Sequence, residues 1–141
     1  MQVVIFSYQD KFYGIPSKHV EEITVDVKWT EVPKTAKWLL GLINLRGNII
    51  SLLDFGNLLN LKDDVQEVEE LCYNNTIIVT TDKDKVALAV DTVQEVVDID
   101  ESEIQLSKFE DNVIKGVYIR NESVINFVDL DALISENVQA V

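Results

Sequence analysis

The chain has few of the residues on which catalytic and metal sites are usually built. It contains a single histidine, His19, and a single cysteine, Cys72, which lie far apart among its 141 residues. No serine or cysteine nucleophile motif lies near His19, and one His with one Cys does not give the ligand spacing of a zinc site. A lone cysteine also excludes a disulfide within the chain. We therefore expect no enzyme activity, no metal and no cofactor.

Prolines and glycines are also scarce, with two and five respectively, while 47% of the residues are hydrophobic. This composition predicts a globular chain and not a disordered one. Its length is that of one ordinary domain, which can bury a usable core. No apolar run approaches membrane-spanning length, and the first residues have a strand pattern in place of a signal peptide. We expect a cytoplasmic protein without direct membrane insertion.

Basic residues are outnumbered, with 12 Lys and Arg against 25 Asp and Glu, which gives a formal net charge of −13. A nucleic-acid surface needs clustered Lys and Arg, but here the basic residues are scattered among acidic ones. The acidic surface expected for this chain would also be repelled by anionic lipid headgroups. The charge balance therefore argues against nucleic acid, and the acidity is explained by solubility.

The residues from 41 to 55 predict a β-hairpin, because two apolar runs meet there across Gly47 and Asn48. Gly47 can adopt the positive φ of the first central position of a type II′ turn, and Asn48 is a favoured second residue. The arm before the turn alternates in hydrophobicity, whereas the arm after it is apolar on both faces except for Ser51. Asp54 follows the second arm and is placed to cap a short helical turn.

The same pattern recurs between residues 116 and 130. At a constant shift of 75 positions, Gly41, Asp54 and Leu58 match Gly116, Asp129 and Leu133. The segments that precede these hairpins match at a shift of 73, so that Glu22 corresponds to Glu95. So long a period indicates a duplicated subdomain, since solenoid repeats run at roughly 20 to 50 residues. Modules of about 70 residues lie near the lower limit for independent folding, so we expect them to share a core or exchange strands.

Further strands are expected near residues 3–8, 12–16, 23–25, 73–81, 85–90, 95–99, 115–120 and 124–128. Short helical turns are expected after Pro16 and from Asp91, and a short amphipathic helix from Asp129. The loop at 28–38 carries Trp29 and Trp38, for which packing and partner binding are both open interpretations. The polar, acidic residues 62–70 are expected to form a solvated linker between the modules.

These motifs together resemble the CheW family, the scaffold proteins of bacterial chemotaxis arrays. The resemblance is carried by Val32-Pro33, by Gly-Leu-Ile-Asn-Leu-Arg-Gly at 41–47, by Leu-Leu-Asp-Phe at 52–55 and by Val-Glu-Glu-Ile at 20–23. It extends along nearly the whole chain. The sequence departs from the family at Ser51 and Ala36, where prolines are common. Both are loop or edge-strand positions, so we expect the fold to be retained and only local stiffness or partner preference to change.

The resemblance implies an all-β fold of two intertwined SH3-like five-stranded barrels with short helices. It implies one CheW-like domain over 1–141, with subdomain 1 at about 15–80 and subdomain 2 at about 1–14 plus 81–141. The implied function is that of an adaptor, which couples the cytoplasmic tip of chemoreceptors to the regulatory domain of the histidine kinase CheA. Such a protein would be a monomer in isolation and would lie at the inner face of the membrane through receptor arrays.

By the same resemblance, the expected partner contacts are Val20, Glu22, Gly41, Asn44, Arg46 and Gly47. A physical argument supports Arg46, which is expected beside a tight turn at a strand end with its head group free; a solvated turn arginine is the alternative. Gly41 and Gly47 also have a structural interpretation, namely room for the backbone. A hydrophobic patch larger than a monomer normally exposes is expected along the strands of the first module.

Two alternatives remain open at this stage. The chain could be a CheW-like regulatory module of a different chemosensory pathway, although the absence of receiver or kinase sequence favours a free-standing adaptor. It could also be a small-molecule-binding β-barrel. That function would require a roomy polar cavity, whereas small barrels fill their interiors with the Ile, Leu and Val side chains that abound here.

Overall fold

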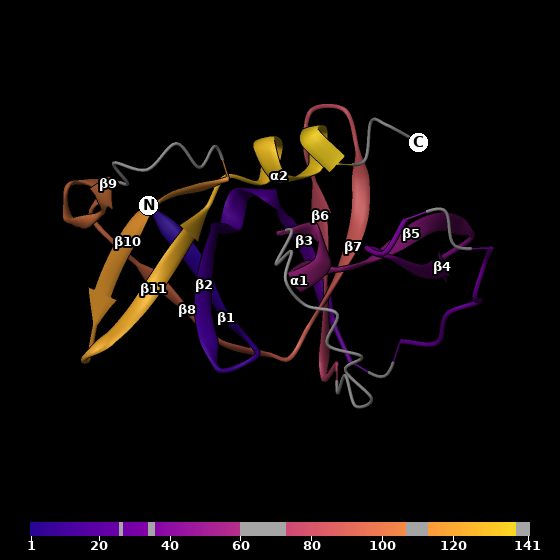
Figure 1. Ribbon diagram of the computed structural model, residues 1–141, viewed down its shortest axis with the longest axis horizontal. Coiled ribbons are helices and arrows are strands. Elements are labelled where there is room, and N and C mark those ends of the chain that lie inside the picture. The colour runs from indigo at the N-terminus through magenta and orange to yellow at the C-terminus, as the bar shows by residue number, and fades with distance from the viewer. Residues whose placement is uncertain (26, 34–35, 60–72, 107–112, 138–141) are drawn as a thin grey trace. The chain divides into compact units, whose positions relative to one another are not determined.

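The computed structural model describes residues 1–25, 27–33, 36–59, 73–106 and 113–137 (Figure 1). The described chain is mostly β-strand with a few short helices, which confirms the predicted all-β class. It divides into two compact units: unit 1 comprises Met1–His19 and Val93–Val141, and unit 2 comprises Val20–Thr92. The expected linker at 62–70 and Cys72 lie outside the described residues. No helix in the described ranges is long and apolar enough to cross a bilayer.

Unit 2 is built on a five-stranded sheet with the strand order β3-β6-β7-β5-β4. Its strands are β3 (Val20–Thr24), β4 (Leu39–Leu45), β5 (Asn48–Asp54), β6 (Asn75–Thr80) and β7 (Lys85–Val90). The β4–β5 and β6–β7 hairpins are antiparallel, and β5 joins β7 in parallel. The strands β4 to β7 supply a buried cluster made of Ile43, Ile50, Leu52, Ile78, Ala87 and Ala89.

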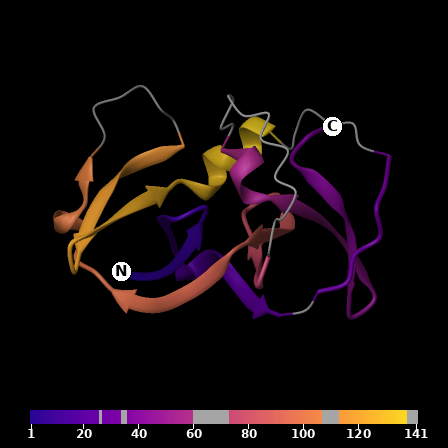
Figure 2. The same ribbon diagram turned by 60° about the horizontal axis from the view of Figure 1, so that its bottom comes forward.

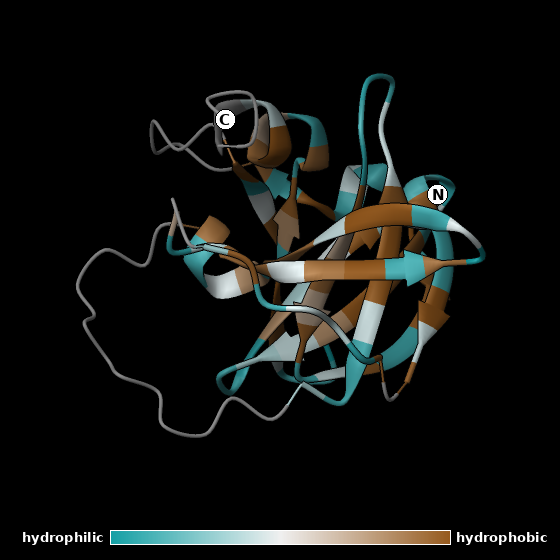
Figure 3. Cartoon of the chain, turned by 90° about the vertical axis from the view of Figure 1, so that its right-hand side faces the viewer, coloured by the Kyte–Doolittle hydropathy of each residue, from teal (hydrophilic) through white to brown (hydrophobic). Residues whose placement is uncertain are grey.

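Unit 1 is built on a six-stranded sheet with the order β8-β1-β2-β11-β10-β9. Its strands are β1 (Gln2–Tyr8), β2 (Lys11–Pro16), β8 (Thr92–Asp98), β9 (Gln105–Leu106), β10 (Ile114–Arg120) and β11 (Ser123–Val128). Figure 2 shows β10 and β11 side by side, with β11 leading into helix α2 (Leu130–Asn137). The buried cluster of unit 1 consists of Val3, Ile5, Ile99, Ile125 and Phe127. Hydrophobic residues follow the strands and hydrophilic residues mark the hairpin tips (Figure 3).

The strand orders show that the two sequence repeats exchange strands. The first repeat supplies β1 to β5, but its β1–β2 hairpin belongs to the unit 1 sheet with β8 to β11 of the second repeat. Conversely, β6 and β7 of the second repeat form the centre of the unit 2 sheet, between β3 and β5. This topology confirms the expectation that modules of this size are completed by each other's strands.

The two hairpins that match at a shift of 75 also end in the same way. Asp54 caps helix α1 (Phe55–Leu58), and its side chain accepts hydrogen bonds from the N–H groups of Gly56 and Asn57. Asp129 precedes α2, where its Oδ1 accepts a hydrogen bond from the Ala132 N–H at 3.2 Å. The predicted capped turn and short C-terminal helix are thus both present.

Of the two helical turns expected before β3 and β8, the first is present and the second is not. Ser17–His19 forms a 3-10 helix (η1) directly after Pro16, as predicted, and β3 begins at Val20. The turn expected from Asp91 is absent because β8 already begins at Thr92. A local capping signal predicted this second turn, but pairing of β8 with β1 gives the backbone a continuous ladder. A second 3-10 helix, η2 (Glu101–Glu103), and the short strand β9 were not predicted.

Candidate docking site

The turn between β4 and β5 consists of Arg46 and Gly47, and not of Gly47 and Asn48 as the sequence predicted. Leu45 and Asn48 are the last paired residues of the hairpin. Arg46 has a φ of 51° and Gly47 a φ of 89°. Positive φ at both central residues is typical of a type I′ turn, so the predicted type II′ turn is wrong by one position. The Asn44 Oδ1 accepts a hydrogen bond from the Gly47 N–H at 2.8 Å and closes the turn.

Arg46 therefore lies within the turn, in a backbone conformation that costs a non-glycine residue about 1–2 kcal/mol. Its side chain is 67% exposed. The guanidinium group donates hydrogen bonds to both carboxylate oxygens of Glu22, at 2.6 and 3.2 Å. The expectation of a free head group is thus wrong, since a bidentate pair fixes its orientation while leaving further N–H groups in solvent.

This ion pair joins the two ends of the unit 2 sheet. Glu22 lies on β3, the first strand in the order, whereas Arg46 directly follows β4, the last. The sheet must therefore curl strongly for the two side chains to meet. The neighbouring carboxylate of Glu21 bonds the Lys85 Nζ at 3.1 Å and the Thr80 hydroxyl at 2.9 Å. These bonds, that of Lys85 first, hold the pKa of Glu21 below its usual value.

The other two expected contact residues have different surroundings. Val20 is half-buried at the start of β3, two positions before Glu22. Gly41 is buried on β4, where a Cβ atom would lie 2.3 Å from the Thr30 carbonyl oxygen and 2.8 Å from the Trp29 Cδ1. The structure therefore brings together Glu22 with Arg46 and Asn44 with Gly47, while Gly41 makes room for a crossing segment of backbone.

Several apolar side chains are exposed in the same unit, while a patch larger than a monomer normally exposes stays a prediction. Unit 2 exposes Ile23, Val25, Trp29 and Ile49, of which Val25 and Ile49 are each 64% exposed. Ile23 follows Glu22 on β3, and Ile49 lies near the start of β5, just after the turn. Exposed apolar residues thus lie next in sequence to Glu22 and close to the turn, a composition suited to protein recognition.

Sequence reasoning missed a second ion pair of the same kind in unit 1. The Arg120 Nε donates a hydrogen bond to the Glu95 carboxylate at 2.7 Å, and this bond raises the pKa of Arg120. Glu95 matches Glu22 at the shift of 73, but Arg120 lies one position before the residue that matches Arg46. The constant spacing of the repeats therefore did not predict this pair, because the arginine is displaced by one residue from the position that matches Arg46.

Comparisons with known proteins identify the family of the chain. The family model described as a CheW-like domain matches residues 2–138. The chemotaxis protein CheW of Thermotoga maritima is 28% identical over 139 residues, which cover 96% of this chain and 88% of the relative. The CheW of Bacillus subtilis is 27% identical over 141 residues, with 96% and 87% covered.

The fold is similar to that of a solved member. The crystal structure of the scaffolding protein TtCheW from Thermoanaerobacter tengcongensis matches with a TM-score of 0.80 and 28% identity, and the match covers 96% of this chain and 93% of that one. The family model, the relatives and the solved structure each span nearly the whole chain. The chain therefore belongs to the CheW-like domain family, and with it to the scaffold proteins of chemotaxis.

Proposed function

We propose that this protein is a chemotaxis adaptor that couples the cytoplasmic tip of chemoreceptors to the histidine kinase CheA by protein–protein docking. It acts in the cytoplasm at the inner face of the membrane, where receptor arrays assemble, and performs no catalysis. Val20, Glu22, Gly41, Asn44, Arg46 and Gly47 are the proposed docking positions. Membership of the CheW-like family supports the scaffold role, and the geometry of the β4–β5 turn supports the position of the site.

The observation that carries this proposal is the conformation of Arg46. The residue has positive φ in a turn for which Asn or Gly would be the easier choice, and it remains largely exposed. An exposed ion pair contributes only about 0–1 kcal/mol to stability, which does not offset the backbone cost. Positive φ recurs in other hairpin turns of the chain, such as that of Asn121 and Glu122, so Arg46 is distinguished by combining it with an exposed guanidinium group that Glu22 holds in place. Glu22 orients the guanidinium group, and this preorganisation favours binding.

The test replaces Arg46 by Glu and by Ala and measures binding to a chemoreceptor cytoplasmic fragment and to the CheA regulatory domain. Both variants are expected to keep the far-UV circular dichroism spectrum and to melt within a few degrees of the wild type, because the lost ion pair is exposed. Loss of a preorganised arginine contact is expected to weaken pull-down of a partner by roughly tenfold or more. The result would be read separately for the receptor and for the kinase.

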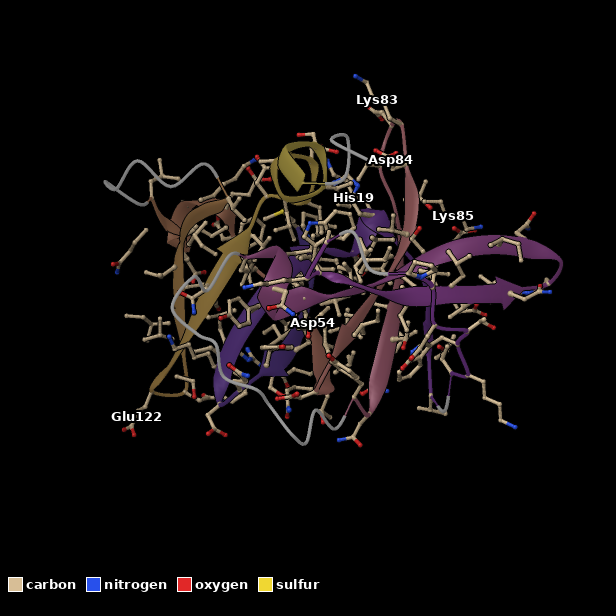
Figure 4. All side chains as sticks on the ribbon, turned by 45° about the vertical axis from the view of Figure 1, so that its right-hand side comes forward. His19, Asp54, Lys83, Asp84, Lys85 and Glu122 are labelled. Atoms are coloured by element: carbon tan, nitrogen blue, oxygen red, sulfur yellow. The ribbon has the colours of Figure 1, made fainter. Side chains whose placement is uncertain are left out.

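Lys83→Glu is the matched control, because it reverses a charge at the exposed tip of the β6–β7 hairpin in the same unit. Figure 4 shows the Lys83 side chain pointing away from the strands. This variant is expected to bind both partners as the wild type does. Wild-type binding by a folded Arg46→Glu protein would remove Arg46 from the site, and equal losses in both variants would indicate a general charge effect.

A further inference from the structure

The residues from 27 to 33, here called the strap, run along the outer edge of β4. In the unit 2 sheet β4 is the last strand, with β5 on its inner side. Thr30 on the strap and Leu42 on β4 exchange two backbone hydrogen bonds, each 2.9 Å long. Gly41 permits this approach, since a Cβ atom there would lie 2.3 Å from the Thr30 oxygen. The strap therefore shields a strand edge that could otherwise pair with another chain.

Three side chains connect the strap to the buried interior of the unit. The Trp29 indole lies over Gly41 and meets the Tyr73 ring edge-on, with 6.4 Å between ring centroids and an angle of 75°. The Tyr73 hydroxyl donates a hydrogen bond to the Asp54 Oδ2 at 2.6 Å. Asp54 is 1% exposed, and its Oδ1 is held by the N–H groups that it caps. Figure 4 shows Asp54 beside α1, and this fixed carboxylate anchors the chain of contacts.

The second repeat shows that the fold does not require these contacts. In unit 1 the strand β9 takes the place of the strap, and a Cβ atom on Gly116 would lie equally close to the Gln105 oxygen. Ile104 occupies the position that matches Trp29 at the shift of 75. The carboxylate that matches Asp54 belongs to Asp129, which instead pairs with the Lys115 Nζ at 3.3 Å. The contacts among Trp29, Tyr73 and Asp54 are therefore present in one repeat, and the strand arrangement does not depend on them.

We propose that Asp54, Tyr73 and Trp29 form a latch that holds the strap closed over β4, and that release of the latch bares the β4 edge without unfolding the unit. The strap is joined to β4 by a single two-bond bridge among the described residues, so local opening costs far less than global unfolding. β4 carries Gly41 and Asn44 and leads directly into the turn with Arg46. The latch thus determines whether the edge of β4, the strand that leads into the proposed docking turn, is covered or bare.

The test is Tyr73→Phe, which keeps the ring against Trp29 and removes only the hydroxyl that bonds Asp54. Hydrogen exchange followed by NMR would report on the amides of Thr30 and Leu42. Loss of a hydrogen bond to a charged group raises the equilibrium constant for local opening about tenfold or more, so both amides are expected to exchange at least about tenfold faster. Core amides of β6 and β7 are expected to exchange at the wild-type rate.

Tyr118→Phe is the matched control, because Tyr118 is a half-buried tyrosine of unit 1 whose side chain bonds Arg120. It is expected to leave the exchange of Thr30 and Leu42 unchanged. Trp29→Leu, which keeps an apolar side chain but loses the edge contact with Tyr73, is expected to accelerate the same two amides. Unchanged protection of Leu42 in Tyr73→Phe, or a uniform acceleration throughout unit 2, would overturn the proposal. Neither result depends on which partner the protein docks.

Discussion

At the scale of single residues, the glycines are required for two different reasons. Some leave no room for a side chain, and one has a backbone conformation that a side chain disfavours. Alanine at Gly41 or Gly116 would place a Cβ atom 2.3 Å from a backbone oxygen, which cannot move aside as a flexible side chain would. Each substitution is expected to lower the free energy of unfolding by roughly 1–3 kcal/mol or more, measured by urea denaturation. Gly47 meets nothing within 4 Å, so Gly47→Ala suffers only from its φ of 89° and is expected to cost about 1–2 kcal/mol.

The two effects can be told apart by hydrogen exchange. Gly41→Ala is expected to expose the amide of Leu42, because the strap must move away, whereas Gly47→Ala is expected to leave that amide protected. Protection of Leu42 in a folded Gly41→Ala protein would mean that Gly41 is not needed for the close approach of Thr30. Reduced partner binding by Gly41→Ala would then indicate direct contact, in place of displacement of the strap.

The candidate site could be predicted in part because its residues lie in one short motif. Asn44, Arg46 and Gly47 are neighbours in sequence, and the family resemblance adds Glu22. Their mutual contacts could not be predicted, because the Arg46–Glu22 pair depends on the curl of the whole sheet. For the same reason nothing in the sequence linked Trp29, Tyr73 and Asp54, which come from three separate segments and meet only after the strands have paired.

At the scale of elements, the hairpin around residue 47 was predicted but its turn was misplaced by one position. Gly47 satisfies either turn type, so local chemistry alone does not decide between them. Pairing decides, because Leu45 lies opposite Asn48 and the register buries Ile50 while it exposes Ile49. The strand β8 follows the same rule, since its ladder to β1 overrides the local helix-capping signal at Asp91.

The equivalent turn of the second repeat offers a clean stability test. Asn121 and Glu122 have φ values of 50° and 67° in the two-residue turn between β10 and β11. Glu122→Gly would create Asn-Gly, the preferred pair for a type I′ turn, and is expected to raise the free energy of unfolding by about 1 kcal/mol. Thermal and urea unfolding would measure the gain. Glu122→Ala retains the strain and serves as control, so an equal gain in both variants would contradict a backbone origin.

At the scale of the whole molecule, the sequence repeat and the structural unit do not coincide. The constant shifts of 75 and 73 revealed the duplication, and the small size of each module predicted that strands would be shared. The hydrophobic pattern alone could not predict which strands are exchanged, and only the family resemblance implied that residues 1–14 join 81–141. In the structure β2 and β7 each lead into a strand of the other sheet through only a short connection. A hydrophobic pattern is the same whether a strand pairs within its own repeat or with the other.

This topology predicts that neither half of the chain folds alone. A fragment of residues 1–66 contains β1 to β5 but lacks β6 and β7, the strands that join β3 to β5, and its β1–β2 hairpin has no further partner. An isolated two-stranded hairpin is at best marginally stable in water, so each separate half is expected to give the circular dichroism spectrum of an unfolded chain. Mixing 1–66 with 67–141 is expected to restore a strand spectrum and a cooperative melt, since both sheets can then be completed. A cooperative melt by either fragment alone would show that each repeat can close its own sheet, and that the exchange of strands is not required for folding.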